Sequence, residues 1–444
     1  MSPRKPRVAC VAFGYPDYPS DTIDRMVNDS CTELEQMDVD VLRVPPVITL
    51  DHVEPAITLL RSEEYDVIIL VLVSWVEAPL LVATLRPFRA VPMVLWSHTT
   101  YMDGDSRVTL GALPAAGVIR ESLEEMSFRF RFVYGMPGEP QLAKGLLPFV
   151  HAAAAERDLA RSRIGLYGYA SMGMYTGTID HTRLRSQLGP EIDHVDQYMI
   201  IERFNKLADA DIRHMQGRAR NWQMLPTVTS ADVNRMFRMY AAIKGLALEG
   251  HHDALTIKCQ YELSRTFGMA PCMPLSLLGD EMVVSCEGDL PLVVTQLIQH
   301  YLTGAPTSYG DLHHVTESSI LLGACGFAPL SFAATRPIVN KHTALYEGLL
   351  NSSPYKGGKV TLARLSSTPS GAFKMHVAGG ESVPGPQFHE VGCPPYPFIT
   401  VKLDGAIDAF MQHICSQHYA IVYGDVRQEL KELCRLLAIT MVSC

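Results

Sequence analysis

Three acidic residues stand where α/β proteins usually keep their chemistry. Glu262 opens a short helix-like run, and Glu287 and Asp289 end the apolar, strand-like run EMVVSCEGD. An acid at the carboxyl end of a strand, followed at once by an apolar helix, lies at the ligand-binding edge of a sheet. Two carboxylates that converge there suit a hard divalent cation, and one of them could also move protons. The structural alternative is that Asp289, which precedes LPLVVTQLI, only caps a helix.

Histidines supply candidate nitrogen ligands for the same cation. His418 lies in MQHICSQHYAIVYGD, at the boundary between an amphipathic helix and an apolar strand. Imidazole is a common metal ligand, although a lone histidine is more often structural or exposed. The pair His313 and His314 follows Asp311 in YGDLHHV. This pair could line a pocket or form a polar turn.

The elements that must position these residues begin with an alternation of apolar and amphipathic segments. Short β-rich runs separated by helical stretches predict a parallel sheet covered on both faces, with its functional loops at the strand ends. The expected strands are residues 7–13, 39–44, 66–73 and 92–96. The expected helices between them are residues 21–36, 52–61 and 78–85.

A second alternating unit follows, and its last strand delivers Glu262. A helix is expected to start at Ser230, as N-cap, and to stop at Gly250. The expected helices of this unit are residues 139–161, 180–188 and 230–250, and its expected strands are residues 163–169 and 254–258.

The sequence pattern changes beyond about residue 341, where short β-like segments are separated by turns rich in Gly, Pro and Ser. This pattern predicts antiparallel, barrel-like structure. The expected fold class is therefore α/β: two Rossmann- or flavodoxin-like parallel-sheet domains followed by a mostly antiparallel, β-barrel-like C-terminal domain. The expected domains are residues 1–160, residues 161–340 with the acidic ligands, and residues 341–444 with the histidine.

Composition narrows the functional classes. A chain of 444 residues with 47% hydrophobic and 19% charged residues predicts a globular protein of several domains. Its net charge of −9 argues against binding to nucleic acid or anionic lipid, because a negatively charged protein does not attract these anions overall. The longest apolar run, residues 67–76, is far shorter than the roughly 20 residues of a membrane span. We expect a cytoplasmic protein, because no secretory leader is recognisable and no CxxC pair occurs among the 10 cysteines.

Several other catalytic signatures are missing from the sequence. GLYGYASMG is not the dinucleotide fingerprint, LLGACGFAP lacks the GK[ST] end of a P-loop, and no GxSxG motif occurs. Cys259, Cys272 and Cys286 lie near the acids in sequence. We expect them to pack as small hydrophobic residues.

Two segments of this chain resemble the L-fucose isomerase and L-arabinose isomerase superfamily, the fucose isomerase side more closely. CEGDLPLVVTQLIQHYLTGAPTSYGD is similar to that family's acidic motif, helix and aspartate-containing strand. FMQHICSQHYAIVYG is similar to the segment that holds its metal-binding histidine. The opening VAFGYPDYPSDT and the loop IGLYGYASMGMY are compatible with its two N-terminal α/β domains.

The resemblance implies a metal-dependent aldose–ketose isomerase. Glu262 would be a metal ligand and proton-transfer base, Asp289 a second ligand and acid/base partner, and His418 the third ligand, with Glu287 as the alternative second ligand. Isomerisation through a cis-enediol needs a base and an electrophile, which a carboxylate and a divalent ion supply. Two carboxylates and one imidazole suit Mn²⁺, with Mg²⁺ or Co²⁺ as alternatives.

The implied substrate is a monosaccharide of the deoxyhexose or pentose type, with no nucleic acid and no membrane as partner. The resemblance also implies a homo-oligomer, a trimer or hexamer, with the site near a subunit interface. Two alternatives stay open: an epimerase or lyase that uses the same enediolate, and a non-catalytic sugar-binding protein. Candidate substrate contacts are Tyr15, Trp75, Met174, Tyr175, Gln260 and His313.

Overall fold

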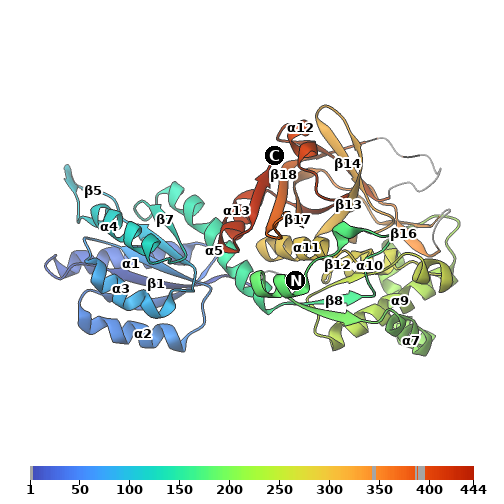
Figure 1. Ribbon diagram of the computed structural model, residues 1–444, viewed down its shortest axis with the longest axis horizontal. Helices are drawn as coiled ribbons and strands as arrows, with labels where there is room; N and C mark the ends of the chain where they lie inside the picture. The colour runs from blue at the N-terminus through green and yellow to red at the C-terminus, as the bar shows by residue number, and fades with distance from the viewer. Residues whose placement is uncertain (1–3, 343–346, 386–387, 389–395) are drawn as a thin grey trace. The chain divides into compact units, whose positions relative to one another are not determined.

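The computed structural model describes residues 4–342, 347–385, 388 and 396–444. The chain forms two compact units, Arg4–Arg157 and Asp158–Cys444 (Figure 1). Helix α5 (Pro140–Arg161) runs across the division between them. The three predicted domains, with boundaries after residues 160 and 340, remain a prediction.

The first unit is built on a five-stranded parallel sheet with strand order β2-β1-β3-β4-β7. This order is the flavodoxin-like arrangement that the alternating sequence pattern predicted. Strands β3 and β4 are buried throughout, and all their residues except Ser97 are apolar, as expected for a parallel sheet covered on both faces. The strands are β1 (Arg7–Phe13), β2 (Asp40–Val47), β3 (Val67–Leu72), β4 (Met93–Ser97) and β7 (Phe130–Tyr134). The helices are α1 (Ser20–Gln36), α2 (Val53–Ser62), α3 (Ala78–Leu85) and α4 (Ala112–Glu125), and a hairpin joins β5 (Tyr101–Asp103) to β6 (Ser106–Val108).

The second unit contains a four-stranded parallel sheet with the order β12-β11-β8-β9. Its strands are β8 (Arg163–Tyr167), β9 (Glu191–Val195), β11 (Ala254–Ile257) and β12 (Val283–Cys286). Its helices are α6 (His181–Gln187), α7 (Tyr198–Lys206), α8 (Asp209–Ile212), α9 (Ser230–Glu249), α10 (Cys272–Leu278) and α11 (Leu290–Thr303). The N-cap of α9 is Thr229 and not the predicted Ser230, because the Thr229 hydroxyl accepts the Asp232 N–H. Gly250 ends this helix as predicted.

A mostly antiparallel seven-stranded sheet completes this unit, with the order β17-β20-β13-β14-β19-β18-β21. Strand β17 also pairs with β18, and β21 runs parallel to β18. The mixed α/β class with two parallel sheets and one mostly antiparallel sheet is confirmed, and the barrel-like form remains a prediction. The strands are β13 (Ser308–Val315), β14 (Ser319–Gly323), β17 (Gly358–Ser367), β18 (Phe373–Val383), β19 (Phe398–Leu403), β20 (His418–Tyr423) and β21 (Thr440–Ser443). The remaining elements are helices α12 (Ile407–Gln412) and α13 (Arg427–Leu436), and a small sheet of β10 (Gln223–Met224), β15 (Ile338–Lys341) and β16 (Leu349–Asn351).

Helix α11 joins the two sheets of the second unit. It contacts β11 and β12 of the parallel sheet and also β17 and β20 of the antiparallel sheet (Figure 1). Every residue from Leu290 to Gln299 is buried, which explains why this helix is apolar on nearly all sides. The residues that begin α11 therefore lie where the two sheets meet. None of the described helices is long and apolar enough to span a bilayer.

Candidate active site

A tight turn connects the end of β12 to the start of α11. Glu287 and Gly288 both adopt left-handed backbone angles, with φ of 65° and 67°. A Cβ at position 288 would overlap the carbonyl of Tyr169, so only glycine fits there. Asp289 then caps α11, since its Oδ1 accepts the Leu292 N–H at 3.0 Å. The CEGD motif thus turns the chain sharply and leaves two acids side by side in a buried position.

Asp289 also holds His418, the first residue of β20. His418 Nδ1 lies 2.8 Å from Asp289 Oδ2, and Arg364 Nη1 donates to the same oxygen at 2.8 Å. All three side chains are buried, with at most 1% of their surface exposed. Burial by itself raises the pKa of Asp289, but the charges of Arg364 and His418 hold that pKa down to about 2. Both oxygens of Asp289 are engaged, which makes this carboxylate an anchor for the imidazole and the guanidinium.

The other ring nitrogen of His418 faces two more carboxylates. His418 Nε2 lies 3.4 Å from Glu287 Oε2 and 3.1 Å from Asp311 Oδ1. Asp311 comes from β13, directly opposite His418 in the antiparallel register. Nε2 makes no well-formed hydrogen bond to any residue in the described part of the chain. When Nδ1–H is donated to Asp289, the lone pair on Nε2 points toward Glu287 and Asp311.

His418 and the carboxylates around it shift one another's pKa values. Burial lowers the pKa of His418, but Asp289, Asp311 and Glu287 outweigh burial and raise that pKa well above its ordinary value. Burial raises the pKa of the Glu287 carboxyl to about 7, although His418 opposes this effect. A proton and a cation are thus alternatives at Nε2, because metal ligation needs the neutral imidazole.

Known proteins have sequences similar to that of this chain. Residues 351–444 match the model of the L-fucose isomerase C-terminal domain. The chain is 26% identical over 403 residues to sulfoquinovose isomerase of Priestia aryabhattai, covering 88% of each chain. It is 25% identical over 363 residues to sulfoquinovose isomerase of Alkalicoccus urumqiensis, covering 80% of each chain. The C-terminal part of the chain is thus similar to L-fucose isomerase, and most of its length is similar to sulfoquinovose isomerases.

These relatives confirm two predictions from the sequence: the resemblance to L-fucose isomerase-like proteins, and an enzyme of the aldose–ketose isomerase class. Among solved structures, a periplasmic solute-binding protein from Actinobacillus succinogenes with bound D-allose covers 57% of this chain and 79% of its own. Its identity to this chain is 13% and its TM-score is 0.17, so this likeness carries no argument about the sugar-binding alternative.

Glu262, which the resemblance to this family assigns as ligand and base, lies in a different environment. It begins a π-helical turn (Glu262–Thr266), and 53% of its side chain is exposed. Its carboxylate forms an ion pair with Lys258, whose hydrogen bond lowers the pKa of Glu262. Among the described residues, no hydrogen bond or ion pair joins it to Glu287, Asp289 or His418. Its predicted role remains a prediction.

The candidate substrate contacts are spread over both units. Met174 and Tyr175 belong to the loop after β8, which touches α11, and the Tyr175 side chain is almost fully exposed. Gln260 is buried, whereas His313 is exposed on β13. Tyr15 and Trp75 lie in the first unit, in loops that follow β1 and β3, and both are half-buried. Their predicted roles are untested.

Two residues of the candidate site were not predicted as ligands or anchors. Asp311 appeared in the sequence only as the neighbour of the His313 pair. Arg364 was not singled out, yet a charged residue within the apolar strand KVTLARLSS is itself a signal, because a buried charge needs a partner. Arg364 also donates to the Thr176 carbonyl at 2.6 Å, which ties the loop after β8 to β17.

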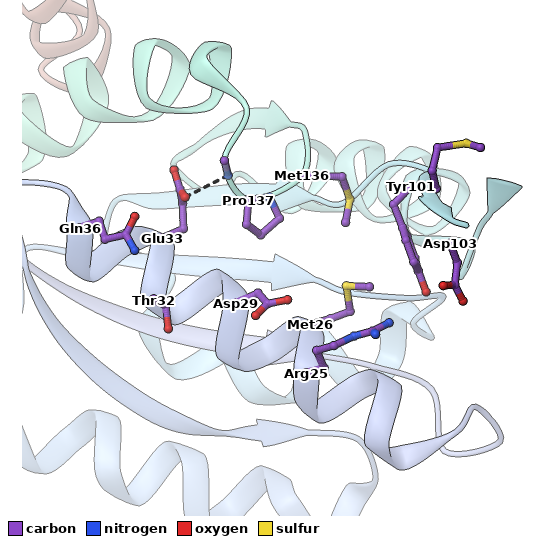
Figure 2. Close-up of a pocket in the computed structure, with 12 residues that line it drawn as sticks. Arg25, Met26, Asp29, Thr32, Glu33, Gln36, Tyr101, Asp103, Met136 and Pro137 are labelled. Carbon is purple, nitrogen blue, oxygen red and sulfur yellow. Dashed lines mark hydrogen bonds between the residues drawn. The ribbon is translucent and has the colours of Figure 1, made fainter. Parts of the chain in front are cut away.

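The first unit carries a separate, open groove of about 550 Å³ (Figure 2). Helix α1, strand β5 and the loop after β7 line it, and Glu33 of α1 accepts the Gly138 N–H at 2.9 Å. Its lining mixes Arg25 with several acidic side chains. Neither Tyr15 nor Trp75 lines this groove.

Proposed function

We propose that this chain is a metal-dependent aldose–ketose isomerase that converts a monosaccharide through a cis-enediol. The observation that carries the proposal is the geometry of His418. One ring nitrogen is anchored by Asp289, and the other faces Glu287 and Asp311 without a well-formed hydrogen bond. The relatives named sulfoquinovose isomerase support the same reaction class.

The residues around Nε2 fit a hard divalent cation. Carboxylate oxygens and one imidazole are the ligands that Mn²⁺ accepts, with Mg²⁺ or Co²⁺ as alternatives. We assign His418, Glu287 and Asp311 to hold the ion, and Asp289 to orient the imidazole in place of ligating the ion. This choice between the two CEGD acids follows from Asp289 having both oxygens engaged. A bound ion would polarise the two neighbouring oxygens of the sugar and so favour the enediol.

A carboxylate must also carry a proton between carbon 1 and carbon 2. Glu287 and Glu262 are the two candidates. Glu287 is buried beside His418, whereas Glu262 is accessible but paired with Lys258. If Glu262 is the base, the substrate must compete with Lys258 for it. The Tyr169 hydroxyl can hold Lys258 during that exchange, because it already lies 2.6 Å from Nζ.

The relatives make sulfoquinovose the first sugar to test, followed by deoxyhexoses and pentoses. Tyr15, Trp75, Met174, Tyr175, Gln260 and His313 remain proposed substrate contacts, and a trimer or hexamer remains the proposed assembly. An epimerase or lyase would share the enediolate, so the product distinguishes these enzymes.

The deciding experiment combines metal removal with product analysis. Purified protein is treated with EDTA, assayed by NMR with sulfoquinovose and a panel of aldoses and ketoses, and then supplied with Mn²⁺. We expect the matching ketose to form, turnover to stop on chelation, and Mn²⁺ to restore it. Turnover by protein shown to be metal-free would reject the metal role. An epimer or cleavage products in place of the ketose would reject the isomerase.

A further inference from the structure

Four cysteines from different segments of the second unit gather around Glu287. Cys259 follows β11, Cys286 ends β12, Cys272 begins α10, and Cys325 follows β14. Cys259, Cys272 and Cys286 are at most 2% exposed, and Cys325 is half-buried. All four are free thiols. The expectation from sequence was that three of them pack as small hydrophobic residues, which does not explain why they converge.

The thiols lie at distances suited to a shared ligand. The sulfur atoms of Cys259 and Cys286 and one carboxylate oxygen of Glu287 all lie within 4.8 Å of one another. Cys325 Sγ lies 3.6 Å from Glu287 Oε1, and Cys272 Sγ donates to the Cys325 carbonyl at 3.2 Å. In a tetrahedral thiolate site with metal–sulfur bonds of about 2.3 Å, neighbouring ligand atoms are about 3.8 Å apart. The ligand atoms of Cys259, Cys286 and Glu287, which lie within 4.8 Å of one another, are therefore at most about 1 Å beyond that spacing.

Glu287 stands between this thiol cluster and the His418 site. Its Oε1 faces Cys325, and its Oε2 faces His418. Thiolates prefer soft or borderline cations, whereas carboxylates and imidazole also accept hard ones. Glu287 is thus the only side chain that both groups of ligands use among the residues described here.

We propose that Cys259, Cys286, Cys325 and Glu287 form a second cation site, specific for a soft or borderline divalent ion such as Zn²⁺ or Cd²⁺. Each thiol releases its proton to water as its sulfur binds the ion, so the step needs no oxidant. The ion reaches the site past Cys325, because this is the one of the three thiols that is partly exposed to solvent. Filling this site draws Glu287 away from His418 and thereby inhibits the enzyme. Binding at the thiols does not depend on the proposed function, whereas the inhibition does.

Cadmium titration tests the binding. Full-length protein, reduced with a phosphine and stripped of metal, is titrated with Cd²⁺, and the ultraviolet thiolate-to-cadmium absorption band is recorded. We expect a band that saturates at one equivalent. Cys325→Ser should lower its amplitude by about one third and Cys259→Ser with Cys325→Ser by about two thirds, because the band counts sulfur–metal bonds. The control is Cys434→Ser, a buried cysteine of α13 outside the cluster, which should leave the band unchanged.

Several results would overturn the site: no saturable band in wild-type protein, an unchanged band in the double variant, or an equal loss in Cys434→Ser. Circular dichroism checks that the serine variants are folded, and Cys325→Ser alone suffices if the double variant is not. Inhibition is measured separately as the Zn²⁺ concentration that halves turnover, which should rise in Cys325→Ser and stay constant in Cys434→Ser. Equal inhibition of both variants would reject the link through Glu287. A protein that turns over no sugar but still gives the cadmium band would refute the proposed function and leave the thiol site standing.

Discussion

The first parallel sheet buries Asp66 just before strand β3, whereas the second buries Glu287 just after strand β12. Asp66 accepts two hydrogen bonds from Arg4, one from Arg157 and one from the Arg7 N–H, at 2.7 to 3.2 Å. Burial raises the pKa of Asp66, but these partners outweigh burial and lower it. Glu287 has no arginine among its described contacts, and burial raises the pKa of its carboxyl.

The difference shows that a buried acidic residue beside a strand can be either structural or part of a binding site, depending on its partners. Asp66 is saturated by cations from its own unit, which is how a structural carboxylate behaves. Glu287 faces a thiol on one side and an imidazole on the other, so it keeps the capacity to bind something else. Its position also fits, since ligands of α/β sheets bind at the carboxyl ends of strands.

The two parallel sheets themselves are closely similar. The order β9-β8-β11-β12 in the second repeats the order β2-β1-β3-β4 in the first. The second sheet is packed, through α11, against an antiparallel sheet that brings Asp311, Arg364 and His418 to the strand ends. We infer that this covering sheet, more than the parallel layer, creates the site. The open groove of the first unit has no comparable buried set among its lining residues (Figure 2).

The comparison is tested most strongly by Glu287→Gln. The amide keeps the shape but removes the charge that faces His418 Nε2, so we expect turnover to fall about 10²–10⁴-fold and Mn²⁺ binding to be lost. Stability should change little, because the cost of burying the Glu287 carboxylate offsets its attraction to the His418 imidazole 3.4 Å away. Turnover, metal content by mass spectrometry and thermal unfolding measure the three effects.

Glu262→Gln is the matched control for this variant. If Glu262 is the base and not a ligand, its loss should lower turnover while Mn²⁺ content stays complete. If Glu262→Gln empties the metal site and Glu287→Gln does not, the ligand set implied by the resemblance is right and our revised set is wrong.

Asp289→Asn should have the next largest effect. The amide can still cap α11, but it no longer balances Arg364 and His418, which are at most 1% exposed. We expect Mn²⁺ affinity to weaken about 10–100-fold, with turnover recovered at high Mn²⁺ concentration. We also expect the second unit to lose about 3–5 kcal/mol, because the Arg364 charge is left buried. Unchanged Mn²⁺ affinity in a folded variant would mean that Asp289 does not orient the imidazole.

The parts of the fold and of the candidate site that could be predicted are those encoded by contiguous stretches of sequence. The parallel strands and the CEGD turn were predicted because apolar runs and the acids that end them are contiguous. Asp311 and Arg364 were missed because they face His418 and Asp289 only through the register and packing of antiparallel strands, which a single sequence does not specify. The thiol cluster was missed because its cysteines lie in or just after four different elements, which only tertiary packing brings together.

Asp66→Asn tests the structural side of the comparison. The change weakens three hydrogen bonds to arginine side chains, so we expect the first unit to lose about 1–3 kcal/mol. The value is below that for a fully buried pair because Arg4 is 41% exposed and solvent screens its charge. Turnover at a temperature where the variant is folded should equal that of wild type. A large loss of turnover would mean that Asp66 is not merely structural.

The smallest expected effect is on how the free energy of unfolding of the first unit changes with pH in the acid range. Because the pKa of Asp66 is lowered in the folded state, its contribution is complete above the ordinary carboxyl range and is lost as the pH falls through the folded pKa. Below about pH 4, the free energy of unfolding of Asp66→Asn should therefore fall less steeply with decreasing pH than that of the parent. The two slopes should differ by the equivalent of up to one proton taken up on unfolding. Urea unfolding in a Trp222→Phe background isolates the first unit, because Trp75 and Trp96 then provide the fluorescence. If the free energy of unfolding falls equally steeply with pH in the two proteins, Asp66 is not the carboxylate whose ion pairs stabilise this sheet in acid.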